Sequence, residues 1–322
     1  MIFVTGAAGL LGNSLLRVAA ERGVAATAIL RDGRASGALD GLSLPAVAVD
    51  LSRESLEKHL ERASVVVHCA ARVAIGRRNM AQLHRDNVVA TARVAAACRV
   101  VGARLVHVST VDTLAWGTPE APGDETPAGA LPRDTTYATT KRLAEAAVED
   151  ERRRGLDAVI LHPGYLIGPW DWKPSSGRML LAAVRGPVAI APPGGNDFCH
   201  AGVVAEAVLE VALRRPPSDR YILSGEALSY TQAFRLMRQA AGRAPRVVTA
   251  PAWMVRIAGR AGDGWGAITG REPDVNSAAA AVACLPHHFS SARAMAEIGY
   301  RPRPAIEAMR EAWTWFVEHG YA

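Results

Sequence analysis

Three glycines, Gly6, Gly9 and Gly12, follow the apolar run Ile2–Val4 near the start of the chain. The residues after Gly9 carry the apolar spacing of a helix, so the glycines lie between an expected strand and an expected helix. Such a turn lets the backbone approach a bound group closely, and the free N–H groups at the helix start attract a pyrophosphate. The pattern therefore predicts a dinucleotide-binding site at this first strand–turn–helix unit.

Short β-branched runs alternate with segments of helical spacing through the first half of the chain. This alternation is typical of a parallel sheet with helices on both faces. The expected strands are Ile2–Val4, Ala26–Leu30, Ala46–Val49, Val65–His68, Leu105–Val108 and Ala158–Leu161. We therefore predict the α/β class with a doubly wound parallel sheet of the Rossmann type.

The alternation stops after His162, where stretches rich in proline and glycine begin. One more helix and strand, Val203–Arg214 and Arg220–Leu223, are expected to return to the sheet. From about Leu228 the chain has the pattern of helices broken by prolines. We expect a dinucleotide-binding domain at 1–164, rejoined by 201–226. A smaller, mainly helical C-terminal substrate lobe is expected from 165–200 and 227–322.

Composition narrows the classes of function and of partner. The chain has 322 residues, of which 49% are hydrophobic, and a formal net charge of +6. Because its arginines form no long block, we expect a small-molecule substrate and no nucleic acid. Four dispersed cysteines and the isolated pair His287-His288 predict neither disulfides nor a metal. The four dispersed cysteines predict a reducing, cytoplasmic setting, and the lack of an apolar run near the roughly 20 residues of a membrane span predicts no membrane insertion.

The residue that closes the second expected strand bears on the choice of cofactor. A cation there accommodates the 2′-phosphate of NADP, whereas an acidic group binds the ribose diol of NAD. Arg31, with Arg34 nearby, favours NADP, while Asp32 leaves NAD open and an ordinary surface arginine is the alternative. At the end of the third strand, Asp50 and Leu51 are candidates for contact with the adenine, although Asp50 could equally be a cap or turn residue.

Tyr137 and Lys141 lie four residues apart in a segment of helical spacing, with Asp134 as its expected cap, and so share one face. The phenol has an ordinary pKa near 10, and a nearby ammonium and a nicotinamide cation are expected to lower it. Hydroxyls at the end of the fifth strand emerge at the edge of the sheet where a nicotinamide would lie. We therefore predict Thr110, with Ser109 as second choice, as the third member of the set.

Together these elements resemble the extended short-chain dehydrogenase/reductase family, in its epimerase/dehydratase-like branch. The matching segments are Thr5-Gly6-x-x-Gly9-x-x-Gly12, His68-Cys69-Ala70-Ala71, Asp86-Asn87-Val88, His107-Val108-Ser109-Thr110, Tyr137-x-x-x-Lys141 and His162-Pro163-Gly164-Tyr165-x-x-Gly168-Pro169. Within the family the chain looks most similar to the members like dihydroflavonol reductase and 3β-hydroxysteroid dehydrogenase, partly through Arg31.

The resemblance implies a role for each of these residues. Tyr137 would exchange a proton with the substrate oxygen, Lys141 would hold the nicotinamide ribose, and Thr110 would hydrogen-bond the reacting oxygen. Asn87 would hold the geometry of the site or serve as a structural residue at a helix start. The expected cofactor-binding residues are Gly6, Ala8, Gly9, Leu10, Leu11, Gly12, Arg31, Asp50, Leu51, Ala70, Ala71, Asn87, Tyr137, Lys141, His162 and Gly164. Helices beside such a sheet often pair in this family, which implies a homodimer.

The expected function is hydride transfer between a nicotinamide cofactor and a ketone or secondary alcohol of a small, ring-containing substrate. By resemblance, the segments after His162 would form the cleft opposite the nicotinamide, and an aromatic lining there suits a ring-containing or apolar carbonyl compound. The alternative is that these side chains pack a small second lobe. The candidates for substrate binding are Tyr165, Trp170, Trp172 and Arg178, with Lys173 and Phe198 beside them.

Two departures from the family pattern affect the prediction. Sugar 4,6-dehydratases of the family carry an acidic pair after the threonine, whereas this chain has Val111-Asp112, which disfavours dehydration. Cys199–Val204 stands where aspartates are usual, which puts the local loop geometry in question. An NAD-dependent sugar epimerase is the second hypothesis, and a non-catalytic dinucleotide sensor is the third.

Overall fold

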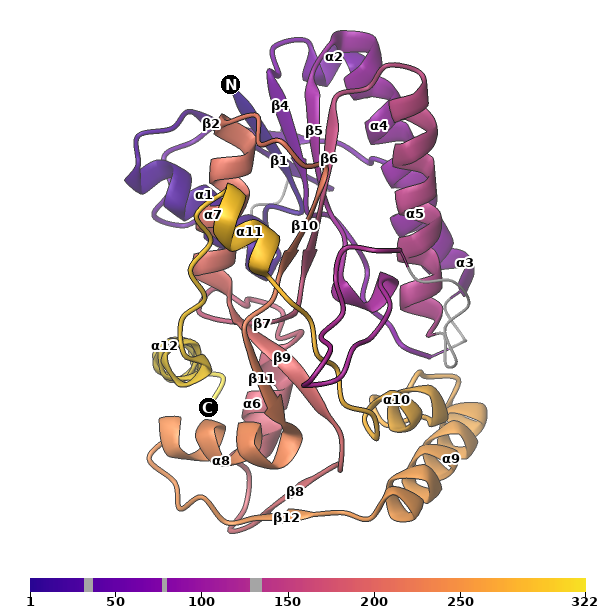
Figure 1. Ribbon diagram of the computed structural model, residues 1–322, viewed down its shortest axis with the longest axis vertical. Helices are drawn as coiled ribbons and strands as arrows, with labels where there is room; N and C mark the ends of the chain where they lie inside the picture. Colours follow the sequence, from indigo (N-terminus) through magenta and orange to yellow (C-terminus); the bar gives the residue numbers. More distant parts are fainter. Residues whose placement is uncertain (32–36, 77–79, 128–134) are drawn as a thin grey trace.

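Seven parallel strands form the central sheet in the order β10-β6-β5-β4-β1-β2-β3 (Figure 1). The computed structural model describes residues 1–31, 37–76, 80–127 and 135–322. The strands are β1 (Ile2–Thr5), β2 (Ala26–Leu30), β3 (Ala46–Ala48), β4 (Val65–His68), β5 (Arg104–Val108), β6 (Ala158–Pro163) and β10 (Arg220–Leu223). All seven predicted strands are present, and the doubly wound Rossmann fold is confirmed. The strand order reverses at β1 and β4, which leaves a crevice at their carboxyl ends.

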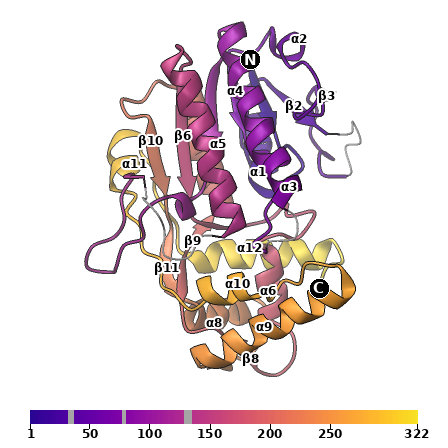
Figure 2. The ribbon, with the colours of Figure 1, turned by 90° about the vertical axis from the view of Figure 1, so that its right-hand side faces the viewer.

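Helices cover both faces of this sheet (Figures 1 and 2). On one face α1 (Leu10–Glu21) packs against α7 (Ala201–Leu213), and their buried leucines and valines share a core with the sheet. On the other face α4 (Ala90–Val101) packs against α5 (Thr136–Arg153). The short elements on this side are α2 (Glu57–Leu60), α3 (Met80–Leu83), the π-helical turn η1 (His84–Val89) and the 3₁₀ turn η2 (Val111–Thr113).

A second lobe lies beyond the carboxyl ends of the strands (Figure 1). Its strands are β7 (Tyr165–Ile167), β8 (Ala189–Ala191), β9 (Gly195–His200), β11 (Glu226–Ser229) and β12 (Val247–Thr249). Its helices are α6 (Gly177–Ala183), α8 (Tyr230–Ala240), α9 (Ala252–Thr269), α10 (Ser277–Val282) and α12 (Ala305–Glu318). The strands form two small sheets, β11-β9-β7 and β12-β8, which the prediction of a mainly helical lobe did not include.

Two segments differ from a simple division of the chain. Helix α11 (Ala292–Glu297), inside the range predicted for the second lobe, contacts β10, and Ala294 and Tyr300 are buried in the core of the main sheet. The segment after Phe198 is regular: it forms the end of β9 and the start of α7. His200 Nδ1 accepts a hydrogen bond from Gly202 N at 3.1 Å and so caps α7. The imidazole thus serves as the helix cap in the segment whose geometry the missing aspartates had put in question.

Candidate active site

The turn between β1 and α1 needs glycine at Gly6 and Gly12, because a side chain at either position would collide with the backbone. Gly6 has φ +68°, and a Cβ there would lie 2.7 Å from Ala70 N. A Cβ on Gly12 would overlap the carbonyl oxygen of Gly6. Gly9 N donates to that same oxygen at 2.9 Å. Gly9 is also the N-cap of α1 and makes no side-chain hydrogen bond there, so the start of the helix is lined by the backbone of Ala8, Leu10 and Leu11. This cradle has the geometry expected of a pyrophosphate site.

Charged groups gather at the ends of β2 and β3. Arg31 Nη2 lies 3.4 Å from Asp86 Oδ2, and its side chain is 61% exposed. Arg72 Nε reaches the same oxygen at 2.8 Å. Asp50 Oδ1 accepts hydrogen bonds from Ser52 N at 2.9 Å and Ser52 Oγ at 2.7 Å, which lower the pKa of Asp50. Asp50 is therefore a turn residue. Asp32 and Arg34 lie outside the described residues.

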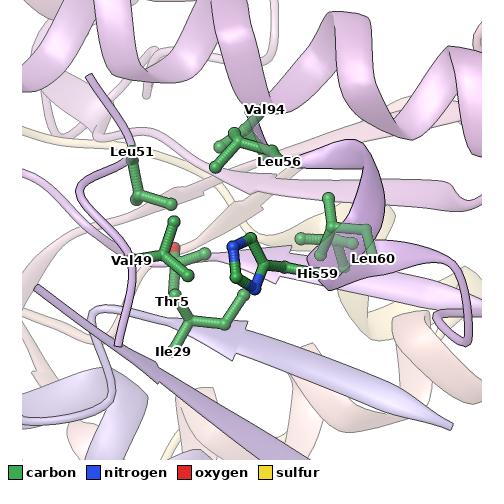
Figure 3. A pocket seen from close by; sticks show the side chains of 9 residues that line it. Thr5, Ile29, Val49, Leu51, Leu56, His59, Leu60 and Val94 are labelled. Atoms are coloured by element: carbon green, nitrogen blue, oxygen red, sulfur yellow. The ribbon is translucent and has the colours of Figure 1, made fainter. Parts of the chain in front are cut away.

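A small apolar pocket lies between the sheet and helices α2 and α4 (Figure 3). Thr5, Val49, Leu51, His59 and Val94 contribute to its lining. The pocket does not admit a water molecule, so it is a gap in the packing of the core. Leu51 therefore faces the core between sheet and helices, next to the turn formed by Asp50.

Tyr137 and Lys141 occupy one face of α5, as predicted from their spacing. Thr135 caps this helix by accepting from Ala138 N at 3.0 Å, and Asp134 lies outside the described residues. Lys141 is almost fully buried, and its Nζ donates to Val108 O at 2.7 Å. Burial lowers the pKa of Lys141 to about 8.

The pKa of Tyr137 is raised in the structure, whereas the prediction has a nearby ammonium and a bound nicotinamide cation lower it. Burial raises this pKa, and the carboxylate of Asp112 raises it further. The ammonium of Lys141 donates a hydrogen bond to the backbone of β5. Asp112, on η2, is a residue that the sequence reasoning had considered only for dehydration. Its position two residues after Thr110, at the end of a central strand, was the available signal.

The two candidate hydroxyls after β5 have different partners. Ser109 Oγ donates to the buried carboxylate of Glu145, so its side chain belongs to the interior. Thr110 Oγ1 accepts only a long hydrogen bond, 3.3 Å, from Asp112 N among the described residues. His162 is fully buried, and its Nδ1 lies 3.2 Å from Thr110 O. These contacts favour Thr110 over Ser109 as the third member of the set. The ring of His162 lies inside the protein, so only its backbone is left for the predicted cofactor contact.

Backbone contacts fix the loops after β4 and β6. Ala70 N donates to Thr5 Oγ1 at 3.2 Å, and Ala71 follows on the exposed side of the loop. Gly164 N donates to Leu223 O at 3.2 Å, and a Cβ on Gly164 would lie 2.7 Å from Asp197 O. Gly164 is therefore required for the close approach of the end of β6 to β9.

Asn87 connects the loop after β4 to helix α5. Its Oδ1 accepts from Arg72 N at 2.7 Å, and its Nδ2 donates to Arg72 O at 3.0 Å. The same nitrogen donates to Thr140 Oγ1 at 3.1 Å, next to Lys141 in the chain. Asn87 therefore holds the helix that carries Tyr137 against the loop that follows β4, which agrees with the expected role in fixing the geometry of the site.

The aromatic candidates for substrate binding fall into two groups. Trp170 and Trp172 pack against Trp315 and His319, on α12 and at its end. The guanidinium of Arg17 on α1 lies 3.4 Å from the ring centroid of Trp170. These contacts belong to the packing between α1 and the second lobe. They do not bring either tryptophan to Tyr137.

Tyr165 belongs to the second group, and its hydroxyl donates to Ser176 O at 2.9 Å. Its ring meets that of Phe198 at 5.3 Å, and Phe198 meets Tyr230 at 6.3 Å. Burial and nearby Asp112 raise the pKa of Tyr230, which reaches about 12. The charge of Asp112 therefore raises the pKa of both Tyr137 and Tyr230. Sequence reasoning missed Tyr230, because it starts α8, far along the chain.

Arg178 lies at the surface and bridges two segments of the second lobe. Its Nη1 is 2.6 Å from Asp274 Oδ1, and both side chains are more than half exposed. An ion pair of this kind contributes little to stability. Arg178 thus joins α6 to the turn after α9. Its predicted contact with substrate stays a prediction.

We expect Lys141→Met to stabilise the protein at neutral pH, because the native state buries the ammonium. Below pH 8 the lysine is charged in both the native and the unfolded state, so the variant should gain about 1–3 kcal/mol in free energy of unfolding. Between pH 8 and 10.5 the native lysine has lost its proton while the unfolded one keeps it, so wild-type stability rises with pH and the gain shrinks. Urea unfolding across this window measures the difference.

The exposed Lys58 on α2 supplies the control for this experiment. Lys58→Met should leave the free energy of unfolding within about 0.5 kcal/mol of wild type. A Lys141→Met protein that is no more stable than wild type at neutral pH would contradict the burial argument.

The comparisons with known proteins agree with this geometry. The model of the NAD dependent epimerase/dehydratase family matches residues 2–223. Sterol demethylase protein B of Methylococcus capsulatus is 30% identical over 98% of this chain and 98% of its own length. The 4-hydroxy-2-methyl-3-oxo-4-farnesyl-3,4-dihydroquinoline-1-oxide ketoreductase of Stigmatella aurantiaca is 30% identical over 96% of each chain. The crystal structure of gox2253 has a TM-score of 0.83 at 28% identity, covering 100% of this chain and 99% of that chain. The chain therefore belongs to the NAD-dependent epimerase/dehydratase family of extended short-chain dehydrogenase/reductases and is an oxidoreductase of that family.

Proposed function

We propose that this enzyme is an NADP-dependent reductase of a ketone on an apolar, ring-containing substrate. The observation that carries the proposal is that Tyr137 and Lys141 share one face of α5, while the rings of Tyr165, Phe198 and Tyr230 pack together in the second lobe. The protein thus has a phenol that can carry a proton and an aromatic cluster that suits an apolar ring. Two relatives, named for a sterol and for a farnesyl-substituted ring ketone, support an apolar ring compound as substrate.

The state of Tyr137 supports reduction as the direction of the reaction. Burial and Asp112 raise the pKa of this phenol, so it stays protonated at neutral pH. A protonated phenol suits donation of a proton to a carbonyl oxygen as that oxygen gains charge. Thr110, whose hydroxyl is hydrogen-bonded to Asp112, would donate a second hydrogen bond to the same oxygen.

The residues present fit a dinucleotide cofactor. The cradle of Gly6, Gly9 and Gly12 would hold the pyrophosphate, and Lys141 would hold the nicotinamide ribose. When bound, the cofactor supplies the hydride. We assign the cofactor to residues 1–164 with 201–226, and the substrate to the contacts that the second lobe adds around Tyr165.

Arg31 is proposed to bind the 2′-phosphate that distinguishes NADPH from NADH. Its ion pair with Asp86 is long, 3.4 Å, and most of its side chain is exposed, so the guanidinium is accessible to a phosphate. Arg31→Ser should raise the Kd for NADPH by about 10- to 100-fold and leave that for NADH nearly unchanged. Titration by the fluorescence of each reduced cofactor measures both.

Arg53, which lies 3.8 Å from Asp50 and is 74% exposed, supplies the matched control. Arg53→Ser should change neither Kd appreciably. Wild-type protein should also oxidise NADPH when given steroid or flavonoid ketones. An equal loss of affinity for NADPH and NADH in Arg31→Ser would contradict the proposed contact between Arg31 and the 2′-phosphate. Tightly held NAD that is released only on denaturation, without net consumption, would instead indicate an epimerase.

A further inference from the structure

Helix α9 packs on the protein through glycines rather than through its large side chains. Gly259 and Gly266 are its buried residues. A Cβ on Gly259 would lie 2.7 Å from the Cβ of Ala280 on α10, and one on Gly262 would overlap the carbonyl oxygen of Val275. In an ordinary surface helix the large apolar residues face the core, whereas here the side that faces the core is made of glycine.

The opposite side of α9 is apolar and exposed. Its residues, which we call the α9 apolar face, are Trp253, Met254, Ile257, Trp265 and Ile268. Measured from Trp253, the others lie one, four, twelve and fifteen positions on, which confines all five to an arc of about 120°. Trp265 is 64% exposed and Ile268 84%. A patch of this kind on a protein surface marks an interaction site.

The two-stranded sheet β12-β8 lies at the same end of the molecule as α9 (Figures 1 and 2). Val248 on β12 and Ile190 on β8 are direct partners in the two-stranded sheet and are both exposed. The chain passes from β12 into α9 through Pro251. No helix among the described residues is both long and apolar enough to cross a bilayer. The α9 apolar face is therefore suited to lie on a surface rather than to span it.

Positive charge borders the α9 apolar face. Arg256 and Arg260 lie within about 60° of Trp253 around the helix. Both are exposed, and neither has an acidic partner among the residues that the structure describes. Asp263, the acidic residue of this helix, accepts hydrogen bonds from Ser277 N at 3.2 Å and from Ser277 Oγ. The border of the patch is therefore cationic, in a chain whose net charge is +6.

We propose that the α9 apolar face, with Arg256 and Arg260, docks this protein on the surface of an anionic lipid bilayer. Tryptophan suits the interface because one end of its ring system is apolar and the other polar, and arginines beside it pair with anionic headgroups. A second copy of the chain is the poorer occupant. In a two-fold dimer through this face, the arginines of both copies would meet with no acidic partner.

The docking surface adjoins the edge of the sheet that carries the candidate active site. Beyond the end of α9, the side chain of Glu272 lies so close to Gly76 that a Cβ there would overlap it. Gly76 follows β4, in the same loop as Arg72, which Asn87 ties to α5. Docking through α9 would therefore hold the carboxyl edge of the sheet near the bilayer. This placement stands whether or not the proposed substrate class is correct.

Flotation with vesicles tests the proposal on the intact protein. We expect binding to phosphatidylcholine vesicles that contain about 30 mol% phosphatidylglycerol, and binding at least about 10-fold weaker to phosphatidylcholine alone. Trp253→Glu with Trp265→Glu should weaken binding to the anionic vesicles by at least about 10-fold. Arg256→Glu with Arg260→Glu should remove the preference for anionic vesicles. Binding should fall as salt is raised.

Val100→Glu on α4 is the matched control, because Val100 is 61% exposed on another face. It should bind vesicles like wild type, and circular dichroism should show that every variant is folded. Equal binding by the tryptophan double variant and wild type would overturn the proposal, as would no binding by wild type. A dimer in solution that the tryptophan substitutions dissociate, with no vesicle binding, would show that a second copy occupies the face and would also overturn it.

Discussion

Tyr137→Phe should lower kcat for carbonyl reduction by about 10²- to 10⁴-fold, which is the usual contribution of a positioned general acid. The substitution removes one hydroxyl and keeps the ring, so α5 should keep its packing. The Kd for NADPH should stay close to that of wild type, because the proposed cofactor contacts of the pyrophosphate cradle and Arg31 remain. Steady-state turnover and cofactor titration on the same preparation separate the two effects.

Tyr300→Phe is the matched control for Tyr137→Phe. Tyr300 is also buried, and its phenol pKa is also raised by burial, but it packs in the core beside Cys199 rather than with Thr110. Its removal should leave kcat within about threefold of wild type. Turnover that is equal in Tyr137→Phe and wild type would refute the proposed proton donor, whereas loss in both variants would point to a structural cause.

The central sheet could be predicted from the sequence because its signals are local. Each buried strand is a short β-branched run between turn residues, and β1 precedes a turn that only glycine can make. The two small sheets of the second lobe have weaker signals. Strands β7 and β8 have only three residues each, and their partners β9 and β12 lie about 30 to 60 positions further along. Pairing between strands that far apart in the chain leaves no periodic pattern in the sequence.

The candidate site likewise has features that the sequence predicts and features that it does not. The spacing of Tyr137 and Lys141 was sufficient to place them on one face of a helix. The bond from Lys141 to Val108 O and the approach of Asp112 to Tyr137 depend on how α5 packs against the end of β5. Trp170 is predicted to bind substrate because it follows His162, and that role stays a prediction. Its ring packs against Trp315 on α12, about 145 residues further along the chain. The role of each of these side chains depends on contacts between segments that are far apart in the sequence.

Gly6→Ala should abolish high-affinity dinucleotide binding, with a loss of at least about 100-fold in the affinity for NADPH. Two costs combine at this position. The φ of +68° is a left-handed conformation that costs an alanine about 1–2 kcal/mol. The new Cβ would also lie 2.7–2.8 Å from backbone atoms of Ala70 and Cys69, which cannot swing aside as a side chain could. The turn must therefore shift, and the cradle for the pyrophosphate shifts with it.

Gly23→Ala separates the two costs. Gly23 has nearly the same backbone conformation, φ +65°, but a Cβ there would meet nothing within 4 Å. It should therefore lose only about 1 kcal/mol of stability and keep its affinity for NADPH. Gly6→Ala should lose about 2–4 kcal/mol, because overpacking adds to the strain. Urea unfolding gives both values, and cofactor titration at a temperature where both variants are folded gives the affinities. If Gly6→Ala bound NADPH as tightly as Gly23→Ala does, the close approach of the turn to Ala70 would not be what shapes the cofactor site.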